Sequence, residues 1–223
     1  MQNLLTTKIR EIFTSIQGEG PYVGQKHVFV RFCKCNLNCE FCDTDFDSKN
    51  AKIYNIDELF DELDKIDCNV VSFTGGEPLM DVLFLKEFLK KYKTELRKKI
   101  YLETNGILFE ELKEIIEYVD VVSMDIKLES ATGQRARYIH NEKFLEIATK
   151  KETFIKVVFD KNIIQEEIDF CTKIARLYRL PLILQPKMPM DKDIELEKIF
   201  NQFYEKYQNV RLIPQVHKFL NVM

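Results

Sequence analysis

The chain has no tryptophan and only seven glycines and six prolines among its 223 residues. So little glycine and proline excludes a collagen-like or low-complexity chain, and a hydrophobic content of 45% is that of an ordinary globular protein. No apolar stretch approaches the length of a membrane span, and the first residues lack the basic segment and apolar core of a signal peptide. We therefore expect a cytoplasmic protein that does not associate with membranes.

A charge excess of one sign is also missing. The chain has 33 basic and 36 acidic residues, a net charge of −3, and its aromatic residues lie beside acidic residues as often as basic ones. No overall field or basic aromatic stripe therefore attracts nucleic acid or anionic lipid. Internal repeats and Gly/Ser linkers are absent too, so we expect one domain covering residues 1–223.

Short β-rich runs alternate with segments whose apolar residues recur at helical spacing. We expect strands at 28–32, 70–73, 100–103, 120–125, 154–159, 181–184 and 210–214. We expect helices at 56–66, 81–96, 108–118, 141–151, 163–178 and 192–207. Such alternation indicates parallel strands joined by right-handed crossovers.

The chemically unusual residues follow the ends of these expected strands, which is typical of an α/β barrel whose site is built from βα-loops. A complete eight-fold barrel needs about 250 residues. This shorter chain has about six such units, so we predict a partial, open TIM-like barrel. A doubly wound open sheet is the structural alternative.

Three cysteines crowd into a C-x3-C-x2-C pattern at Cys35, Cys39 and Cys42. In a reducing compartment such clustering favours a metal site over a disulfide. Three thiolates suit an iron–sulfur cluster with one iron open to a small molecule, whereas four suit structural zinc or an ordinary ferredoxin-type cluster. Cys33 could be a fourth ligand, but its position at the end of a β-run favours packing as a small apolar residue.

Two glycine-containing segments and one arginine are further candidates. The run Thr74–Pro78 is either a strand-to-helix turn or a ligand contact in which Glu77 accepts from an ammonium group. The run Ser15–Gly20 is a loop or hairpin whose polar groups can bind amide or carboxyl functions. Arg31, inside an apolar run, is half of an ion pair or a clamp for a substrate carboxylate.

The cysteine pattern followed by Gly75-Gly76-Glu77-Pro78 resembles the radical S-adenosylmethionine (SAM) superfamily. Further segments resemble one of its families, 7-carboxy-7-deazaguanine synthase, in the expected order over nearly the whole chain. These segments are Ser15–Gly20, Phe29–Arg31, Cys39–Thr44, Glu103–Gly106 and Gln215–Lys218.

This resemblance implies a homodimeric radical SAM lyase of queuosine and 7-deazapurine biosynthesis. The enzyme would convert 6-carboxy-5,6,7,8-tetrahydropterin to 7-carboxy-7-deazaguanine with release of ammonia. Its cofactors would be a [4Fe–4S] cluster, SAM and Mg²⁺, and its reductant a protein such as flavodoxin or ferredoxin.

The resemblance also assigns residues by motif. The cluster ligands are Cys35, Cys39 and Cys42, and the magnesium ligand is Thr44. The expected SAM contacts are Phe41, Cys42, Asp43, Gly76, Ser123, Met124, Asp125, Gln185 and Pro186. The expected pterin contacts are Ile16, Gln17, Gly18, Glu19, Arg31, Thr74, His217 and the terminal Met223.

The chain departs from the family pattern at two positions. Lys34 stands where the family usually has glycine before the first cluster cysteine, and Cys33 adds a thiol beside the motif. Neither change removes a ligand. The alternative functions are an activase for a glycyl-radical enzyme, which would need a protein partner, and a non-enzymatic iron–sulfur or zinc module.

Overall fold

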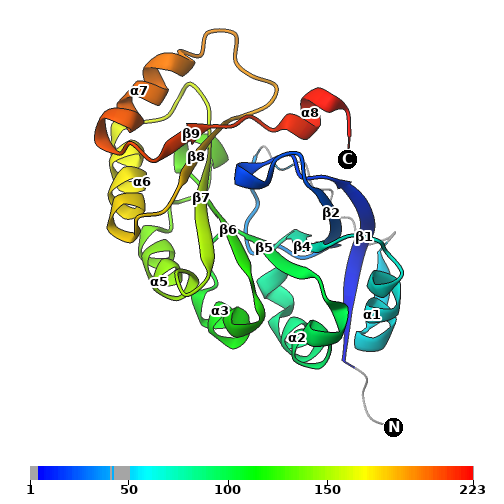
Figure 1. Ribbon diagram of the computed structural model, residues 1–223. Helices are drawn as coiled ribbons and strands as arrows, with labels where there is room; N and C mark the ends of the chain where they lie inside the picture. Colours follow the sequence, from blue (N-terminus) through cyan, green and yellow to red (C-terminus); the bar gives the residue numbers. More distant parts are fainter. Residues whose placement is uncertain (1–4, 41, 43–50, 223) are drawn as a thin grey trace.

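Strands and helices alternate along the chain in the computed structural model, which describes residues 5–40, 42 and 51–222 (Figure 1). The strands are β1 (Thr6–Ile16), β2 (Lys26–Phe32), β3 (Lys52–Asn55), β4 (Val70–Gly75), β5 (Lys99–Thr104), β6 (Val121–Ile126), β7 (Glu152–Phe159), β8 (Leu182–Pro186) and β9 (Val210–Leu212). The α-helices are α1 (Ile56–Asp64), α2 (Val82–Leu96), α3 (Phe109–Ile115), α4 (Glu129–Thr132), α5 (Tyr138–Ala148), α6 (Gln165–Tyr178), α7 (Leu196–Lys206) and α8 (Val216–Leu220).

Within the described residues the nine strands form one sheet in the order β3-β1-β2-β4-β5-β6-β7-β8-β9. Neighbours from β2 to β9 are parallel, and β1 runs antiparallel to both β2 and β3. The larger helices follow one another around the outside of the curved sheet (Figure 1). Because β3 and β9 remain separate edges, the sheet is an open partial barrel with six βα units in its described part, as predicted.

All seven predicted strands and six predicted helices are present, with boundaries shifted by a few residues. Two strands were not predicted, β1 and β3, which form the antiparallel edge of the sheet. Thr7 and Ile9 are buried on one face of β1, but the strand then continues as Arg10, Glu11 and half-buried residues. Arg10 and Glu11 line a cavity and interrupt the alternation of apolar and polar residues that identifies a strand.

The parallel strands have two different faces. Alternate residues such as Val30, Phe73 and Leu102 pack against the outer helices in the main core. The inward residues form a smaller apolar cluster at one end of the barrel, made of Tyr22, Val70, Tyr101, Val121, Phe154 and Ile183. Further along the same strands the inward residues become polar. The apolar cluster therefore closes the barrel interior below a polar layer.

The loop after β1 is anchored in this apolar cluster. Tyr22, at the end of the short 3-10 helix Gly20–Tyr22, packs edge-on against Tyr101 with ring centroids 5.3 Å apart. Gly20 has a φ of +66°, and a Cβ there would lie 2.6 Å from the ring of Phe154. Glycine is thus required where the chain enters the barrel. Its entry places Gln17 and Glu19 over the polar layer.

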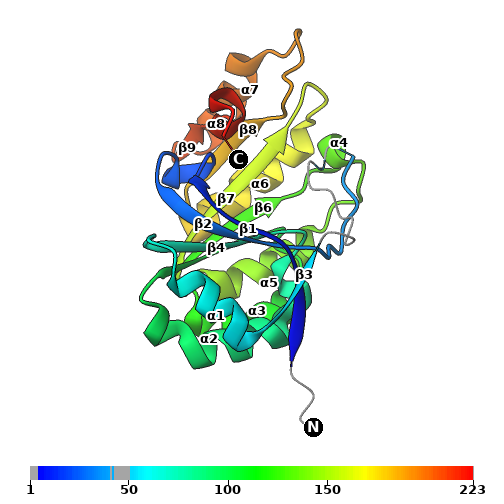
Figure 2. The ribbon, with the colours of Figure 1, turned by 90° about the vertical axis from the view of Figure 1, so that its right-hand side faces the viewer.

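Figure 2 shows the barrel from the side, with the loop after β2 and helix α4 at the same end of the strands. This is the carboxyl end of the parallel strands, where the sequence motifs were expected to meet. No helix in the described part of the chain is both long and apolar enough to cross a membrane.

Candidate functional site

A cavity of about 530 Å³ lies at the carboxyl ends of the parallel strands. Its volume falls within the range of roughly 300–1,000 Å³ that is usual for small-molecule sites. Cys35, Cys39 and Cys42 line one side, which we call the cluster side. The loop of Gln17–Glu19, with Thr74, Glu103 and Lys156, lines the other, which we call the substrate side.

The cluster side is a loop that carries its thiols on a short backbone turn. The Cys42 amide donates to the Cys39 carbonyl at 3.1 Å, and the Leu37 amide donates to Cys35 Sγ at 3.5 Å. Burial raises the pKa of the Cys39 thiol to about 11 and also raises that of Cys35. A bound cationic metal offsets this effect because it binds and stabilises the thiolate form.

The donor set fits a multinuclear cluster. Among the described residues, no three His, Cys, Asp or Glu side chains lie close enough together to hold a single metal ion. A cubane cluster has no such requirement, because each cysteine binds a different iron. Cys33 is 7% exposed and does not line the cavity with the other three thiols. Cys35, Cys39 and Cys42 thus share the cavity wall, and Cys33 does not join them there.

The glycines after β4 let two loops touch. The Gly76 amide donates to the Phe32 carbonyl at 3.1 Å, and the Glu77 amide donates to the Lys34 carbonyl at 2.6 Å. A Cβ at Gly76 would lie 2.5 Å from the Lys34 carbonyl carbon. Any larger residue at position 76 would push the loop that carries the cysteines away from the sheet.

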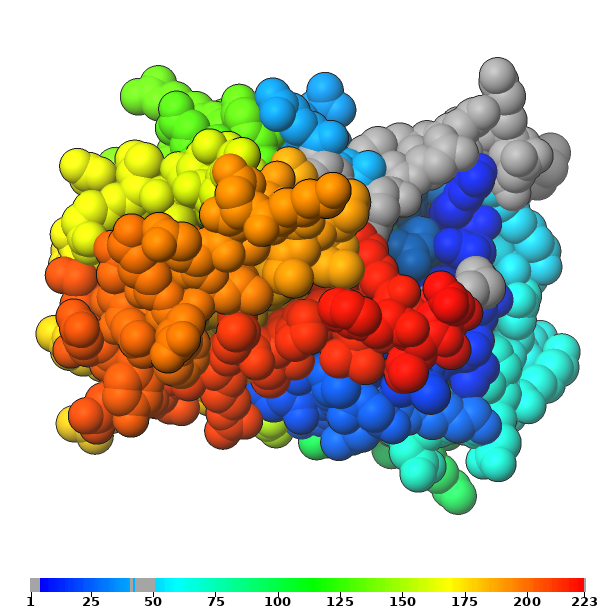
Figure 3. Space-filling view, turned by 90° about the horizontal axis from the view of Figure 1, so that it is seen from above, coloured from blue at the N-terminus to red at the C-terminus, as the bar shows by residue number. Residues whose placement is uncertain are grey.

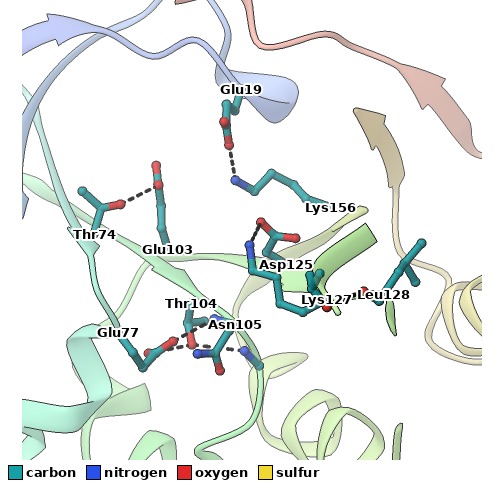
Figure 4. A network of polar contacts seen from close by, with 12 residues as sticks. Glu19, Thr74, Glu77, Glu103, Thr104, Asn105, Asp125, Lys127, Leu128 and Lys156 are labelled. Carbon is teal, nitrogen blue, oxygen red and sulfur yellow. Dashed lines mark hydrogen bonds and ion pairs between the residues drawn. The ribbon is translucent and has the colours of Figure 1, made fainter. Parts of the chain in front are cut away.

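Glu77 has a buried structural role and not the ligand contact that the sequence left open. Its side chain is buried and accepts from Thr104 Oγ1 at 2.9 Å, the Asn105 amide at 2.8 Å and the Leu79 amide at 3.2 Å (Figure 4). Burial raises its pKa to about 7 despite these donors. Glu77 does not line the cavity, so it joins the ends of β4 and β5 and does not present its carboxylate to an ammonium group.

Asn105 connects that network to the cysteine loop. Its Nδ2 donates to Asn36 Oδ1 at 2.7 Å, and its own backbone amide is held by Glu77. Asn36 directly follows Cys35. Two hydrogen bonds thus connect the buried carboxylate of Glu77 to Asn36, the residue after Cys35.

On the substrate side, Glu103 is shared by two candidate pterin contacts. Gln17 Nε2 donates to Glu103 Oε1 at 2.8 Å, and Thr74 Oγ1 donates to Glu103 Oε2 at 2.7 Å. Figure 4 shows Thr74 and Glu103 pointing toward each other from β4 and β5. Gln17 and Thr74 are buried and Glu103 is half-buried, so this carboxylate faces the cavity with two of its acceptor directions occupied.

A buried ion pair forms the next part of this side. Lys156 on β7 is paired with Glu19, which also accepts from Gln215 Nε2 at 2.8 Å (Figure 4). Burial would raise the pKa of Glu19, but the Lys156 ammonium outweighs it and lowers the pKa to about 2. Burial opposes the charge of Lys156 as well, yet the carboxylates of Glu19, Glu103 and Asp125 raise its pKa. Both partners are therefore charged.

A second ion pair lies between the two sides. Lys127 Nζ and Asp125 Oδ2 are 2.8 Å apart at the end of β6. Burial works against the charge of Lys127, but Asp125 raises its pKa overall. Asp125 Oδ1 is buried and has no hydrogen-bond partner among the described residues, although Asp125 lines the cavity. A polar ligand at this position would satisfy that oxygen.

Aromatic rings form the remaining wall. Phe13 and Phe29 stack with centroids 5.1 Å apart at an interplanar angle of 13°. Arg31 lies over the Phe13 ring, and its Nε donates to Glu11 Oε1 at 2.8 Å. Arg31 therefore forms the ion pair considered from the sequence. It also lines the cavity, so the carboxylate clamp stays a prediction.

The structure brings most predicted site residues to this one cavity. Its wall includes Cys35, Cys39, Cys42, Gly76, Asp125, Ile16, Gln17, Gly18, Glu19, Arg31, Thr74 and His217. Four predicted SAM contacts are buried in their strands and do not line it: Ser123, Met124, Gln185 and Pro186. The side-chain amide of Gln185 has no partner among the described residues. Phe41, Asp43, Thr44 and Met223 lie outside the described residues.

Sequence reasoning missed Glu103, Lys156, Lys127 and Asn105 as individual site residues. Lys156 had a recognisable signal, because it interrupts the apolar run 154–159 as Arg31 interrupts the run 28–32. An ionised side chain inside such a run needs a partner, which is the same argument that singled out Arg31. Glu103 and Asn105 lie in a segment that carries the family resemblance, and Lys127 follows a strand, but neither signal assigned them an individual role.

Comparisons with known proteins identify the family of this chain. Residues 29–157 match the sequence profile described as Radical SAM superfamily. A 7-carboxy-7-deazaguanine synthase of Geobacter sulfurreducens is 32% identical, covering 96% of this chain and 96% of that protein. Another, of Archaeoglobus fulgidus, is 31% identical over 95% of this chain and 97% of its own. The chain belongs to the 7-carboxy-7-deazaguanine synthase family.

Solved structures confirm the fold. QueE from Escherichia coli superposes with a TM-score of 0.67 at 20% identity, covering 97% of this chain and 96% of that one. SuiB from Streptococcus suis, in its complex with the precursor peptide SuiA, gives a TM-score of 0.60 at 18% identity and covers 81% of this chain. Family membership makes this chain a radical SAM enzyme with a [4Fe–4S] cluster, SAM and Mg²⁺ as cofactors.

Proposed function

We propose that this chain converts 6-carboxy-5,6,7,8-tetrahydropterin to 7-carboxy-7-deazaguanine with release of ammonia, as one catalytic domain over residues 1–223. The observation that carries the proposal is the shared cavity. Three cysteines line one side of it, and a hydrogen-bonded set suited to a small polar ring lines the other.

Cys35, Cys39 and Cys42 would hold the [4Fe–4S] cluster. When bound, the reduced cluster and SAM supply one-electron chemistry that starts the reaction by removing a hydrogen atom from the substrate. Asp125, with its unpartnered Oδ1, would bind a polar group of SAM, beside Gly76. The predicted contacts Phe41, Asp43, Ser123, Met124, Gln185 and Pro186 belong to the same proposal.

Gln17, Thr74 and Glu103 would recognise the pyrimidine half of the pterin. A carboxylate has about four acceptor directions, and two of those on Glu103 are used by Gln17 and Thr74. The remainder can accept from the ring N–H and exocyclic amino group, which are donors side by side. Ile16 and Gly18 would close around the ring, and the stacked Phe13 and Phe29 would exclude water.

Arg31 and His217 would bind the carboxylate end of the substrate, because they bring hydrogen-bond donors to the cavity wall. Thr44 would supply a neutral oxygen to Mg²⁺, an ion that usually keeps waters and substrate oxygens in its coordination shell. The terminal carboxylate of Met223 is the last predicted contact.

Replacing Thr44 with Ala should weaken the dependence of turnover on magnesium while iron content stays normal. Lost iron with an unchanged magnesium response would contradict this role.

We further propose that the active form is a homodimer and that flavodoxin or ferredoxin delivers the electron. The direct test of the function is anaerobic reconstitution followed by assays of SAM cleavage with and without the pterin. We expect the carboxylated deazaguanine and ammonia to form in equal amounts only when the pterin is present. SAM cleavage without either product would favour the activase alternative, and a colourless zinc-containing preparation would favour the non-enzymatic module.

A further inference from the structure

The chain's last described segment, residues 213–222, lies across the substrate side. Space-filling Figure 3 shows this segment, in red, directly against blue residues of the N-terminal part. Gln215, His217, Lys218 and Val222 line the cavity from it. Its position therefore determines whether the substrate side has a complete wall.

Ile213 packs the start of this segment against the apolar cluster, but apolar packing contributes little to holding helix α8. Helix α8 is five residues long and has no buried residue. Phe219 is 57% exposed and Leu220 is 54% exposed. A short helix without a buried face is not stable by itself, so specific contacts must hold it in place.

Those contacts converge on the loop Gly18–Glu19. The Val216 amide donates to the Gly18 carbonyl at 2.9 Å, and Gln215 Nε2 donates to Glu19 Oε1 at 2.8 Å. His217 lies so close above Gly18 that a Cβ there would be 2.6 Å from the Cβ of His217. All three contacts involve consecutive residues of the segment, on a loop that the barrel itself anchors.

Glu19 has both carboxylate oxygens engaged in this arrangement. Oε2 is paired with Lys156 on the rigid strand β7, and Oε1 accepts from Gln215. Its backbone amide donates to Gln17 Oε1 at 3.0 Å. Each oxygen of this carboxylate thus already contacts a protein group, one on β7 and one on the C-terminal segment. Its geometry suits a bridge between β7 and the C-terminal segment.

We propose that Glu19 is a positioning residue: it links Lys156 to Gln215 and thereby holds His217 in place for the substrate. This inference rests on the proposed function for the role of His217, but the link between the segments is independent of it. It replaces direct pterin binding as the role of Glu19. Without the link, the Val216–Gly18 hydrogen bond and the contact of His217 with Gly18 would still hold the segment against this loop, but less firmly.

Hydrogen exchange of the metal-free protein tests the link without any catalysis. In Gln215→Ala the amide of Val216 should exchange faster by about tenfold or more, because a hydrogen bond to a charged acceptor has been removed. Lys156→Met removes the other partner of the Glu19 carboxylate and should also speed the exchange of the Val216 amide. Gln208→Ala, which changes the same residue type on the exposed turn before β9, should leave that exchange unchanged. Unaltered protection of Val216 in Gln215→Ala would overturn the proposal.

Kinetics then separates positioning from direct binding. In Gln215→Ala the KM for the pterin should rise about tenfold while kcat changes far less. The variant loses the hydrogen bond to Glu19 that holds the C-terminal segment against the cavity. Glu19→Gln should raise KM too, and the double variant should be no worse than the poorer single one, since both break the same link. Additive losses would show that Glu19 contacts the substrate itself and would refute the proposal. An inactive wild-type enzyme would refute the proposed function alone, because the exchange experiment would still report on the link.

Discussion

Glu77 and Glu19 are both buried glutamates at the same end of the same barrel, yet their pKa values are displaced in opposite directions. Burial raises the pKa of Glu77 to about 7, because its partners are neutral donors on the protein backbone and Thr104. Burial acts in the same sense on Glu19, but Lys156 reverses it and lowers the pKa to about 2. The nature of the partner, and not the depth of burial, decides the charge.

This difference separates the two sides of the cavity. The cluster side is held mainly by hydrogen bonds between neutral groups and by the close approach at Gly76, with one exposed ion pair between Lys34 and Asp81. The substrate side is held by the Glu19–Lys156 ion pair and by Glu103. Substitutions on the two sides should therefore fail in different ways.

The largest effect is expected on the cluster side. Replacing Cys35, Cys39 or Cys42 with Ala should abolish SAM cleavage and the absorbance of the cluster, because each thiolate holds a separate iron. Cys33→Ala is the matched control, since Cys33 does not line the cavity, and it should retain both. Iron content and anaerobic SAM cleavage measure the outcome. A Cys33→Ala protein without iron would make Cys33 a ligand and would end the three-cysteine assignment.

The second effect concerns stability. Lys156→Met leaves the Glu19 carboxylate buried without its cation and should lower the free energy of unfolding by about 3–5 kcal/mol. Glu77→Gln keeps an amide oxygen that can accept from the same donors and should cost much less. Urea denaturation of both metal-free variants at neutral pH provides the comparison. Equal losses would show that the charge of Lys156 is unimportant.

The third effect is the pH dependence of the same free energy. Glu19 has a folded pKa below its ordinary 4.5, so its contribution is present above pH 4.5 and is lost as the pH falls toward about 2. Glu77 has a folded pKa near 7, so its contribution is largest below pH 4.5 and decreases as the pH rises to about 7. Each contribution is of the order of 3 kcal/mol.

Denaturation midpoints measured from acid to neutral pH in wild type, Glu19→Gln and Glu77→Gln would separate the two contributions to the free energy of unfolding. Glu77→Gln should remove the decrease in stability between about pH 4.5 and 7. Glu19→Gln should reduce the loss of stability below about pH 4.5. A Glu77→Gln protein with the wild-type slope across that interval would mean that Glu77 is ionised throughout.

The smallest effect is expected at Thr74. Thr74→Val removes one donor to Glu103 and should raise the KM for the pterin about five- to tenfold, since one hydrogen bond to a carboxylate is worth roughly 1–2 kcal/mol. Thr74→Ser keeps the hydroxyl and should stay near wild type. SAM cleavage without the pterin should be unchanged in both. A loss of uncoupled cleavage would place Thr74 on the cluster side.

Much of this architecture was predictable from local patterns. Alternating β-rich and helical runs identified all seven parallel strands, and the cysteine spacing predicted a ligand loop whose three thiols line the cavity. Strand β1 was missed because Arg10 and Glu11, which line the cavity, interrupt its apolar alternation. The role of Glu77 was left open between a turn and a ligand contact, because a sequence motif carries no information about which neighbouring strand supplies its hydrogen-bond donors.

The residue order alone specifies periodicity and ligand spacing, which are local quantities set by a few consecutive side chains. It was therefore sufficient for the parallel strands and for the three cysteines. Apart from the Leu79 amide two positions from Glu77, the side-chain partners of Glu19, Glu103 and Glu77 come from residues 27 to 196 positions away. Only folding brings them together, because the charge of a buried carboxylate depends on groups that meet it through space.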